Sequence, residues 1–110
     1  MKHFLIYTNQ YKDRGLETTQ YIRQYLEARD LRVSVKLIER EKDPAEKIPQ
    51  DADCMIVLGG DGTVLQAVRE KQDRHLPIVG VNLGTLGYMT EVELINLDKA
   101  LERLVEGDYE

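Results

Sequence analysis

The chain has 110 residues and a mass of 12.7 kDa, which is the size of one ordinary domain. Its formal net charge is −5 and its basic residues are scattered, which argues against a nucleic-acid partner bound through phosphate neutralisation. No apolar run approaches the ~20 residues that cross a bilayer, and no secretory signal opens the chain, so we expect a cytoplasmic protein with no membrane partner. Cys54 is the only cysteine, which excludes an internal disulfide.

The first half of the chain predicts a strand, a helix and a second strand. Residues 3–8 have an apolar centre that is too short for a buried helix, and residues 9–14 form a polar connection. Residues 15–30 carry apolar side chains at helical spacing, which indicates an amphipathic helix. Residues 31–38 alternate between apolar and polar side chains, as a strand near the sheet edge does. The charged, proline-containing residues 39–51 form a surface connection.

The central feature is an uncharged run, residues 54–58, followed by a glycine-rich turn, residues 59–63. The run is typical of a strand buried on both faces. Gly59 and Gly60 permit unusual backbone angles and leave room for ligand oxygens near the peptide N–H groups. Asp61 would begin the next helix, to which an apolar stripe of Val64, Leu65 and Val68 belongs. A strand, a glycine turn and a helix start form an anion-binding geometry, and a phosphate would fit there.

Asp61 complicates a phosphate site, because a carboxylate repels a phosphate unless a positive charge intervenes. The turn contains no Lys or Arg, and Arg69 and Lys71 lie about two turns further along the helix. The site therefore needs a divalent metal or a basic residue from elsewhere in the chain, and we infer a metal carried by the nucleotide. The alternative is that Asp61 only caps the helix, but capping does not account for the three surrounding glycines.

The remaining residues predict a helix to about residue 73, a strand at 76–81, a glycine-punctuated loop at 82–90 and a helix at 96–106. The apolar side chains of the loop either cover the core or an interface, or form a wall for an adenine or nicotinamide ring, with Tyr88 as the stacking residue. The order of elements predicts an α/β fold: a three-layer parallel sheet with helices on both faces. The glycine-rich turn at residues 59–63 and the loop at residues 82–90 both follow strands, at the ends where such sheets bind ligands.

Gly59-Gly60-Asp61-Gly62-Thr63 resembles the GGDGT signature shared by NAD kinases, diacylglycerol and sphingosine kinases and, more distantly, phosphofructokinases. Residues 80–91 resemble a segment that NAD kinases carry after the next strand and that lipid kinases lack. With both motifs in order, residues 1–110 are identified as the N-terminal α/β nucleotide-binding domain of a NAD kinase. The resemblance implies that a second, β-rich domain of such kinases lies beyond the end of this sequence.

The resemblance also implies an activity for the complete protein: transfer of a phosphoryl group from ATP or polyphosphate to the adenosine ribose 2′-hydroxyl of NAD, giving NADP. A divalent metal, Mg²⁺, would come with ATP, and no residue of the chain is assigned as a metal ligand. Asp61 matches the catalytic aspartate of the family. At a helix start this carboxylate is a weak base, which suffices for a loose transition state. The resemblance assigns nucleotide binding to Gly59, Gly60, Asp61, Gly62, Thr63, Leu65 and Tyr88.

Two other functions stay open from the sequence, a lipid kinase of the GGDGT type and a non-catalytic nucleotide-binding module. We also expect the chain alone to bind nucleotides weakly and to lack significant kinase activity, because the family's second domain supplies much of the dinucleotide site. Without that domain, the apolar loop at residues 83–89 would favour self-association into a homo-oligomer.

Overall fold

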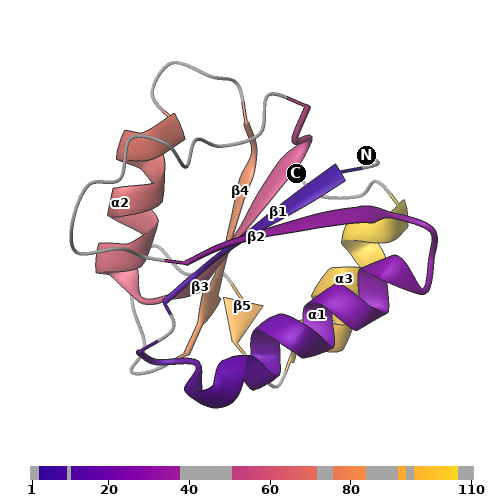
Figure 1. The fold of residues 1–110 in the computed structure, drawn as a ribbon, viewed down its shortest axis with the longest axis horizontal. Helices are drawn as coiled ribbons and strands as arrows, with labels where there is room; N and C mark the ends of the chain where they lie inside the picture. The colour runs from indigo at the N-terminus through magenta and orange to yellow at the C-terminus, as the bar shows by residue number, and fades with distance from the viewer. Residues whose placement is uncertain are drawn as a thin grey trace.

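The structure is a computed structural model that describes residues 3–9, 11–37, 51–71, 76–83, 92–93 and 96–106. These residues alternate between strands and helices, and Figure 1 shows their arrangement. A short 3-10 turn, η1 (Arg14–Leu16), precedes the first helix. The strands and α-helices are β1 (His3–Thr8), α1 (Glu17–Glu27), β2 (Arg32–Leu37), β3 (Cys54–Gly59), α2 (Asp61–Lys71), β4 (Ile78–Asn82), β5 (Val92–Glu93) and α3 (Leu97–Glu106).

The strands form one parallel sheet in the order β2-β1-β3-β4-β5. From β1 the chain passes through α1 to the outer neighbour β2, whereas from β3 it passes through α2 to β4 on the other side. The direction of winding therefore reverses between β1 and β3. In open α/β sheets, ligands bind outside the carboxyl ends of the strands at this switch point.

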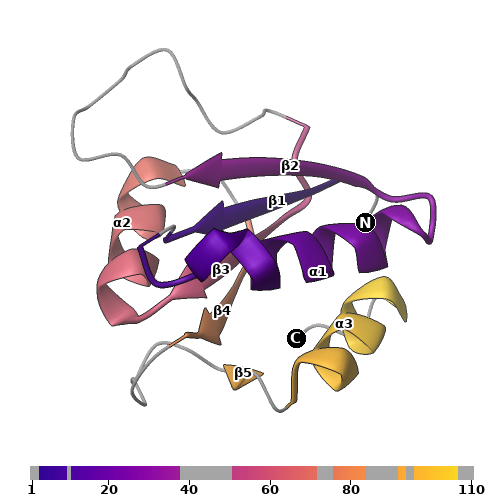
Figure 2. The same cartoon turned by 60° about the horizontal axis from the view of Figure 1, so that its bottom comes forward.

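The three-layer arrangement expected from the sequence is confirmed, with helices on both faces of the sheet (Figures 1 and 2). Alternate residues of β1 and β3 point to opposite faces, as the pleat of a strand requires. On one face Phe4 and Ile56 pack with buried residues of α1 and α3. On the other face Leu5 and Val57 pack with buried residues of α2. The helix residues of the two cores are Ile22, Leu26, Leu97, Leu101 and Leu104 on the first face and Val64 and Ala67 on the second.

Most elements lie where the sequence predicted them, including β2 at the sheet edge, but the predicted apolar stripe of α2 was partly wrong. Val64 is buried as expected, whereas Leu65 is 46% exposed and Val68 is 40% exposed. Ala67, three residues after Val64, takes the second core position, so the side of α2 that meets the sheet is turned toward Ala67 and away from Val68. The two-residue strand β5 was not predicted; it pairs with the end of β4.

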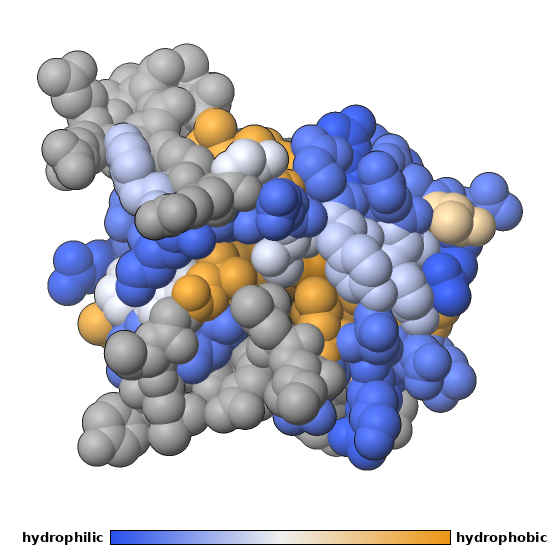
Figure 3. Space-filling model, turned by 90° about the horizontal axis from the view of Figure 1, so that it is seen from below, coloured by the Kyte–Doolittle hydropathy of each residue, from blue (hydrophilic) through white to orange (hydrophobic). Residues whose placement is uncertain are grey.

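The described surface is mainly hydrophilic at its edges, and hydrophobic residues are visible near the centre of the view from below in Figure 3. The large hydrophobic side chains with substantial exposure are Tyr11, Tyr21, Val35, Leu65, Val68 and Val105. Among the described residues, no helix combines the length and the apolar character needed to span a membrane.

Candidate functional site

Hydrogen bonds tie together the chain segments that leave β1, β3 and β4 at the carboxyl edge of the sheet. The Asn9 amide donates to the Leu58 carbonyl at 2.9 Å, and the Leu83 amide donates to the Gly59 carbonyl at 3.0 Å. Gly59 is also the strand partner of Asn82. The glycine turn and the beginning of the second motif therefore lie side by side. The rest of that motif, including Tyr88, lies outside the described residues.

Gly59 is required by the packing of Thr63. Gly59 has φ +157°, a conformation that residues with a side chain rarely adopt, and a β-carbon there would lie 2.3 Å from Thr63 Oγ1. Thr63 is 6% exposed, and its hydroxyl accepts a hydrogen bond of 3.4 Å from Asn9 Nδ2. These two predicted site residues thus join the end of β3 to the first turn of α2 and to the loop after β1.

Asp61 is the first residue of α2 and not its capping residue. The Val64 amide donates to the Gly60 carbonyl at 3.1 Å, which makes Gly60 the N-cap. Asp61 is partly exposed at the start of the helix, where the helix dipole favours a negative charge. Gly62 is exposed, and nothing lies within 4 Å of the position of a β-carbon on it. The turn is therefore open to solvent around Asp61 and Gly62.

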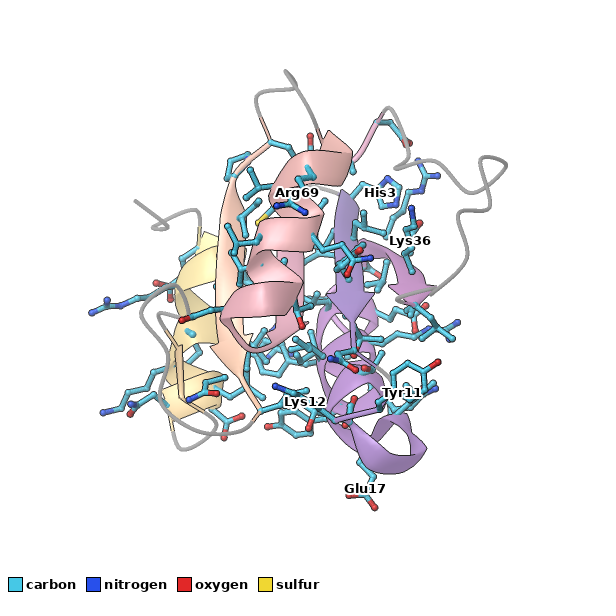
Figure 4. All side chains as sticks on the ribbon, turned by 90° about the vertical axis from the view of Figure 1, so that its left-hand side faces the viewer. His3, Tyr11, Lys12, Glu17, Lys36 and Arg69 are labelled. Carbon is cyan, nitrogen blue, oxygen red and sulfur yellow. The ribbon has the colours of Figure 1, made fainter. Side chains whose placement is uncertain are left out.

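A basic residue that sequence analysis did not select lies against this turn. Lys12 Nζ is 3.1 Å from the position that a β-carbon on Gly60 would take. In Figure 4 the Lys12 side chain lies below the start of α2. The sequence shows Lys12 only as part of a polar connection after the first strand. Only the pairing of β1 with β3 places this connection beside the glycine turn.

The loop after β1 is held by hydrogen bonds of Asn9. The Asn9 carbonyl accepts hydrogen bonds from the amides of Lys12 and Asp13, both at 3.0 Å. Asn9 Oδ1 accepts another from the Tyr11 amide at 3.0 Å. Because Asn9 is itself bonded to Leu58, these contacts fix the loop backbone relative to the end of β3.

Asp13 anchors the other end of this loop to α1. Its carboxylate accepts hydrogen bonds from the Thr18 amide at 3.0 Å, the Thr19 amide at 2.8 Å and Thr19 Oγ1 at 2.6 Å. Asp13 is only 4% exposed, and both of its carboxylate oxygens are held by hydrogen bonds from the start of α1. The Thr19 hydroxyl also contacts Thr8 Oγ1 at 3.0 Å, which links α1 to the end of β1.

Leu65 lies one turn after Asp61 on α2 and is exposed on the same side of the helix. Its position is compatible with a ligand at the glycine turn. In the described ranges, no group of three or more His, Cys, Asp or Glu side chains gathers closely enough to hold a metal ion. The described part of the site is therefore a glycine turn with one carboxylate and one adjacent ammonium group.

Comparison with known proteins identifies the family. Residues 6–109 match the family model described as the ATP-NAD kinase N-terminal domain. The chain belongs to the NAD kinase family. It is 41% identical to a NAD kinase of Agathobacter rectalis over 99% of this chain and 40% of the relative. It is 39% identical to a NAD kinase of Lachnospira eligens over 100% of this chain and 40% of the relative. The chain thus spans about 40% of the length of these NAD kinases.

A solved structure shares the fold of this NAD kinase domain. The structure of yeast NADH kinase complexed with NADH matches with a TM-score of 0.75. The match covers 98% of this chain and 39% of the yeast chain, at 19% sequence identity. At this identity the match supports the α/β architecture, whereas membership of the NAD kinase family rests on the sequence matches.

Proposed function

We propose that the complete protein transfers the terminal phosphoryl group of ATP or inorganic polyphosphate to the 2′-hydroxyl of the adenosine ribose of NAD, giving NADP. Membership of the NAD kinase family supports this activity. The observation that carries it is the position of the GGDGT turn, which begins at the end of β3 beside the second motif and next to the switch point of the sheet. A lipid kinase has less support, because the family match includes the segment that lipid kinases lack.

In the proposed reaction, Asp61 positions the 2′-hydroxyl and accepts its proton. The hydroxyl oxygen forms a bond to the terminal phosphorus as the bond from that phosphorus to the leaving phosphate oxygen breaks. Phosphoryl transfer of this kind depends mainly on positioning and on neutralisation of charge, so a weak base can serve. The exposed and unobstructed Gly62 lets phosphate oxygens approach the first turn of α2.

Several features of the complete protein belong to this proposal. A divalent cation, Mg²⁺, enters bound to the phosphate donor, since the glycine turn offers a single carboxylate. The protein acts in the cytoplasm as a homo-oligomer. We also propose that residues 1–110 alone lack significant kinase activity, because they span about 40% of the length of their relatives and the resemblance implies that a second domain supplies the rest of the dinucleotide site. Tyr88 stacks against a base of the dinucleotide.

The test is the Asp61→Asn variant of the complete protein, which keeps the size of the side chain and removes its charge. We expect kcat to fall roughly 100- to 10,000-fold, the range for loss of a general base, while the affinity for NAD changes little. NADP formation is followed by a coupled dehydrogenase assay, and NAD affinity is measured by calorimetry.

Asp30→Asn is the matched control. Asp30 is exposed, and it precedes the amino end of β2, whereas Asp61 follows the carboxyl end of β3. The φ of Asp30, +62°, is one that Asn tolerates. This control is expected to keep wild-type turnover. Undiminished turnover by the Asp61→Asn variant would remove Asp61 from the mechanism, and a wild-type protein that forms no NADP would overturn the proposed function.

A further inference from the structure

We propose that Lys12 is a phosphate-binding residue of this site, whose ammonium group contacts phosphate oxygens of the substrates held beside Asp61. The inference rests on the proposed function and adds to it a residue outside both sequence motifs. Its starting point is the contact of Lys12 Nζ with the Gly60 position, at 3.1 Å from a β-carbon built there.

The backbone of Lys12 is fixed in this place by its neighbours. On one side the Asn9 carbonyl accepts a hydrogen bond from the Lys12 amide, and Asn9 itself forms hydrogen bonds to the end of β3 and to Thr63. On the other side the buried Asp13 carboxylate holds the start of α1. Lys12 is therefore presented toward the glycine turn from a loop with anchors at both ends. The direction of the side chain is visible in Figure 4.

The charges around Lys12 favour an anion. Among the described residues no carboxylate forms an ion pair with Lys12. The adjacent Asp13 carboxylate is turned into the fold and occupied by α1. Gly60 is the N-cap of α2, so the Lys12 ammonium group lies near the positive end of this helix, where the first backbone amides and the helix dipole also favour an anion. A bound phosphate would satisfy the ammonium and the first amides of α2 together.

Lys12 also supplies the positive charge that a phosphate needs beside Asp61. The glycine turn contains a carboxylate and no Lys or Arg, so a phosphate would be repelled there. Because β1 lies beside β3, the fold brings a positive charge to the turn from the preceding loop. The contact does not depend on a particular base or sugar, and it would serve the polyphosphate chain of the donor or the pyrophosphate of NAD.

The test uses Lys12→Gln, which removes the charge but keeps most of the side chain, and Lys12→Arg, which keeps the charge. The control is Lys99→Gln on α3, an exposed lysine remote from the glycine turn. Initial rates of the complete protein are measured with ATP, tripolyphosphate and NAD varied in turn, at two salt concentrations. A rise in KM only for the donors assigns Lys12 to the donor phosphates, and a rise only for NAD assigns it to the pyrophosphate.

We expect Lys12→Gln to raise one of these KM values roughly 10- to 100-fold, as loss of a hydrogen bond to a charged group does, and to weaken its dependence on salt. Lys12→Arg should recover most of the loss, and Lys99→Gln should behave as wild type. A folded Lys12→Gln protein with all KM values and salt dependences unchanged overturns the inference while leaving NAD phosphorylation intact. If the wild-type protein forms no NADP, the proposed function fails instead. Calorimetric binding of tripolyphosphate, compared between wild type and Lys12→Gln, then decides the role of Lys12 by itself.

Discussion

A β-carbon on Gly59 would lie 2.3 Å from the Thr63 hydroxyl oxygen and 2.7 Å from the Thr63 β-carbon. Thr63 thus occupies the space that a side chain at position 59 would need. Because Gly59 ends β3 and Thr63 lies in the first turn of α2, this contact sets how closely the helix follows the strand. The glycine therefore has a structural role that is independent of any ligand.

Gly59→Ala should destabilise the chain. The added methyl group overlaps Thr63 near its backbone, and φ +157° is unfavourable for alanine. Overpacking of this kind costs about 1–3 kcal/mol of unfolding free energy, which a urea titration followed by circular dichroism would measure. An alanine variant as stable as wild type would show that α2 can shift away from β3 without cost.

Gly62→Ala separates binding from folding. A β-carbon at Gly62 has no neighbour within 4 Å, and Gly62 lies in helix α2, so the variant should be as stable as wild type or up to about 1 kcal/mol more stable. In the complete protein we nevertheless expect kcat/KM to fall at least about tenfold, because the methyl group blocks the approach of phosphate oxygens to the helix start. Full activity in steady-state assays would mean that the substrates do not approach Gly62.

Cys54 should be unreactive in the folded chain. Burial, assisted by the nearby Asp53 charge, raises the pKa of the Cys54 thiol to about 12. The thiolate is the nucleophilic form, and Cys54 is 0% exposed, so the thiol is both protonated and inaccessible at pH 8. We expect labelling by Ellman's reagent to be at least about 100-fold slower in buffer than in denaturing urea. Equal rates in the two conditions would show that β3 opens readily.

Asp51 should make stability depend on pH in the acid range. Desolvation raises the pKa of Asp51, but a backbone hydrogen bond and the nearby His3 and Arg32 outweigh it, so the pKa lies below its ordinary value of 3.8. Arg32 is 2.8 Å from the Asp51 carboxylate, and His3 Nδ1 is 3.1 Å from it. The unfolded chain binds a proton at Asp51 more readily than the folded chain does. The stabilisation is therefore present above the ordinary pKa of Asp51 and is lost as pH falls through the lower pKa of the folded chain.

Urea unfolding of wild type and of Asp51→Asn from pH 7 to pH 2 would measure this dependence. The variant should be less stable at pH 7, and the difference should shrink below pH 3.8. Asp30→Asn, an exposed carboxylate in the turn before β2, is the control for general charge effects. A constant difference between wild type and Asp51→Asn over the whole range would contradict the assigned ion pair of Asp51 with Arg32.

Local patterns in the sequence were sufficient to predict most elements, because a buried strand and an amphipathic helix each have their own spacing of apolar residues. The uncharged run before Gly59 and the glycines after it place β3 and the start of α2 without tertiary information. The same pattern was insufficient for the side of α2 that meets the sheet, where Ala67 rather than Val68 is buried. On a helix with few large apolar residues, packing against the sheet decided the buried side.

The sequence by itself determined the order of strands and helices, the GGDGT turn and the position of Asp61 at a helix start. Only the tertiary structure decided that Asn9 and Lys12, about fifty residues earlier, lie beside that turn. The reason is that neighbours in a parallel sheet are set by how whole strands bury their faces against the helices, which no single stretch of sequence encodes. Placing β1 next to β3 joined a lysine from one loop to a carboxylate-bearing glycine turn in another.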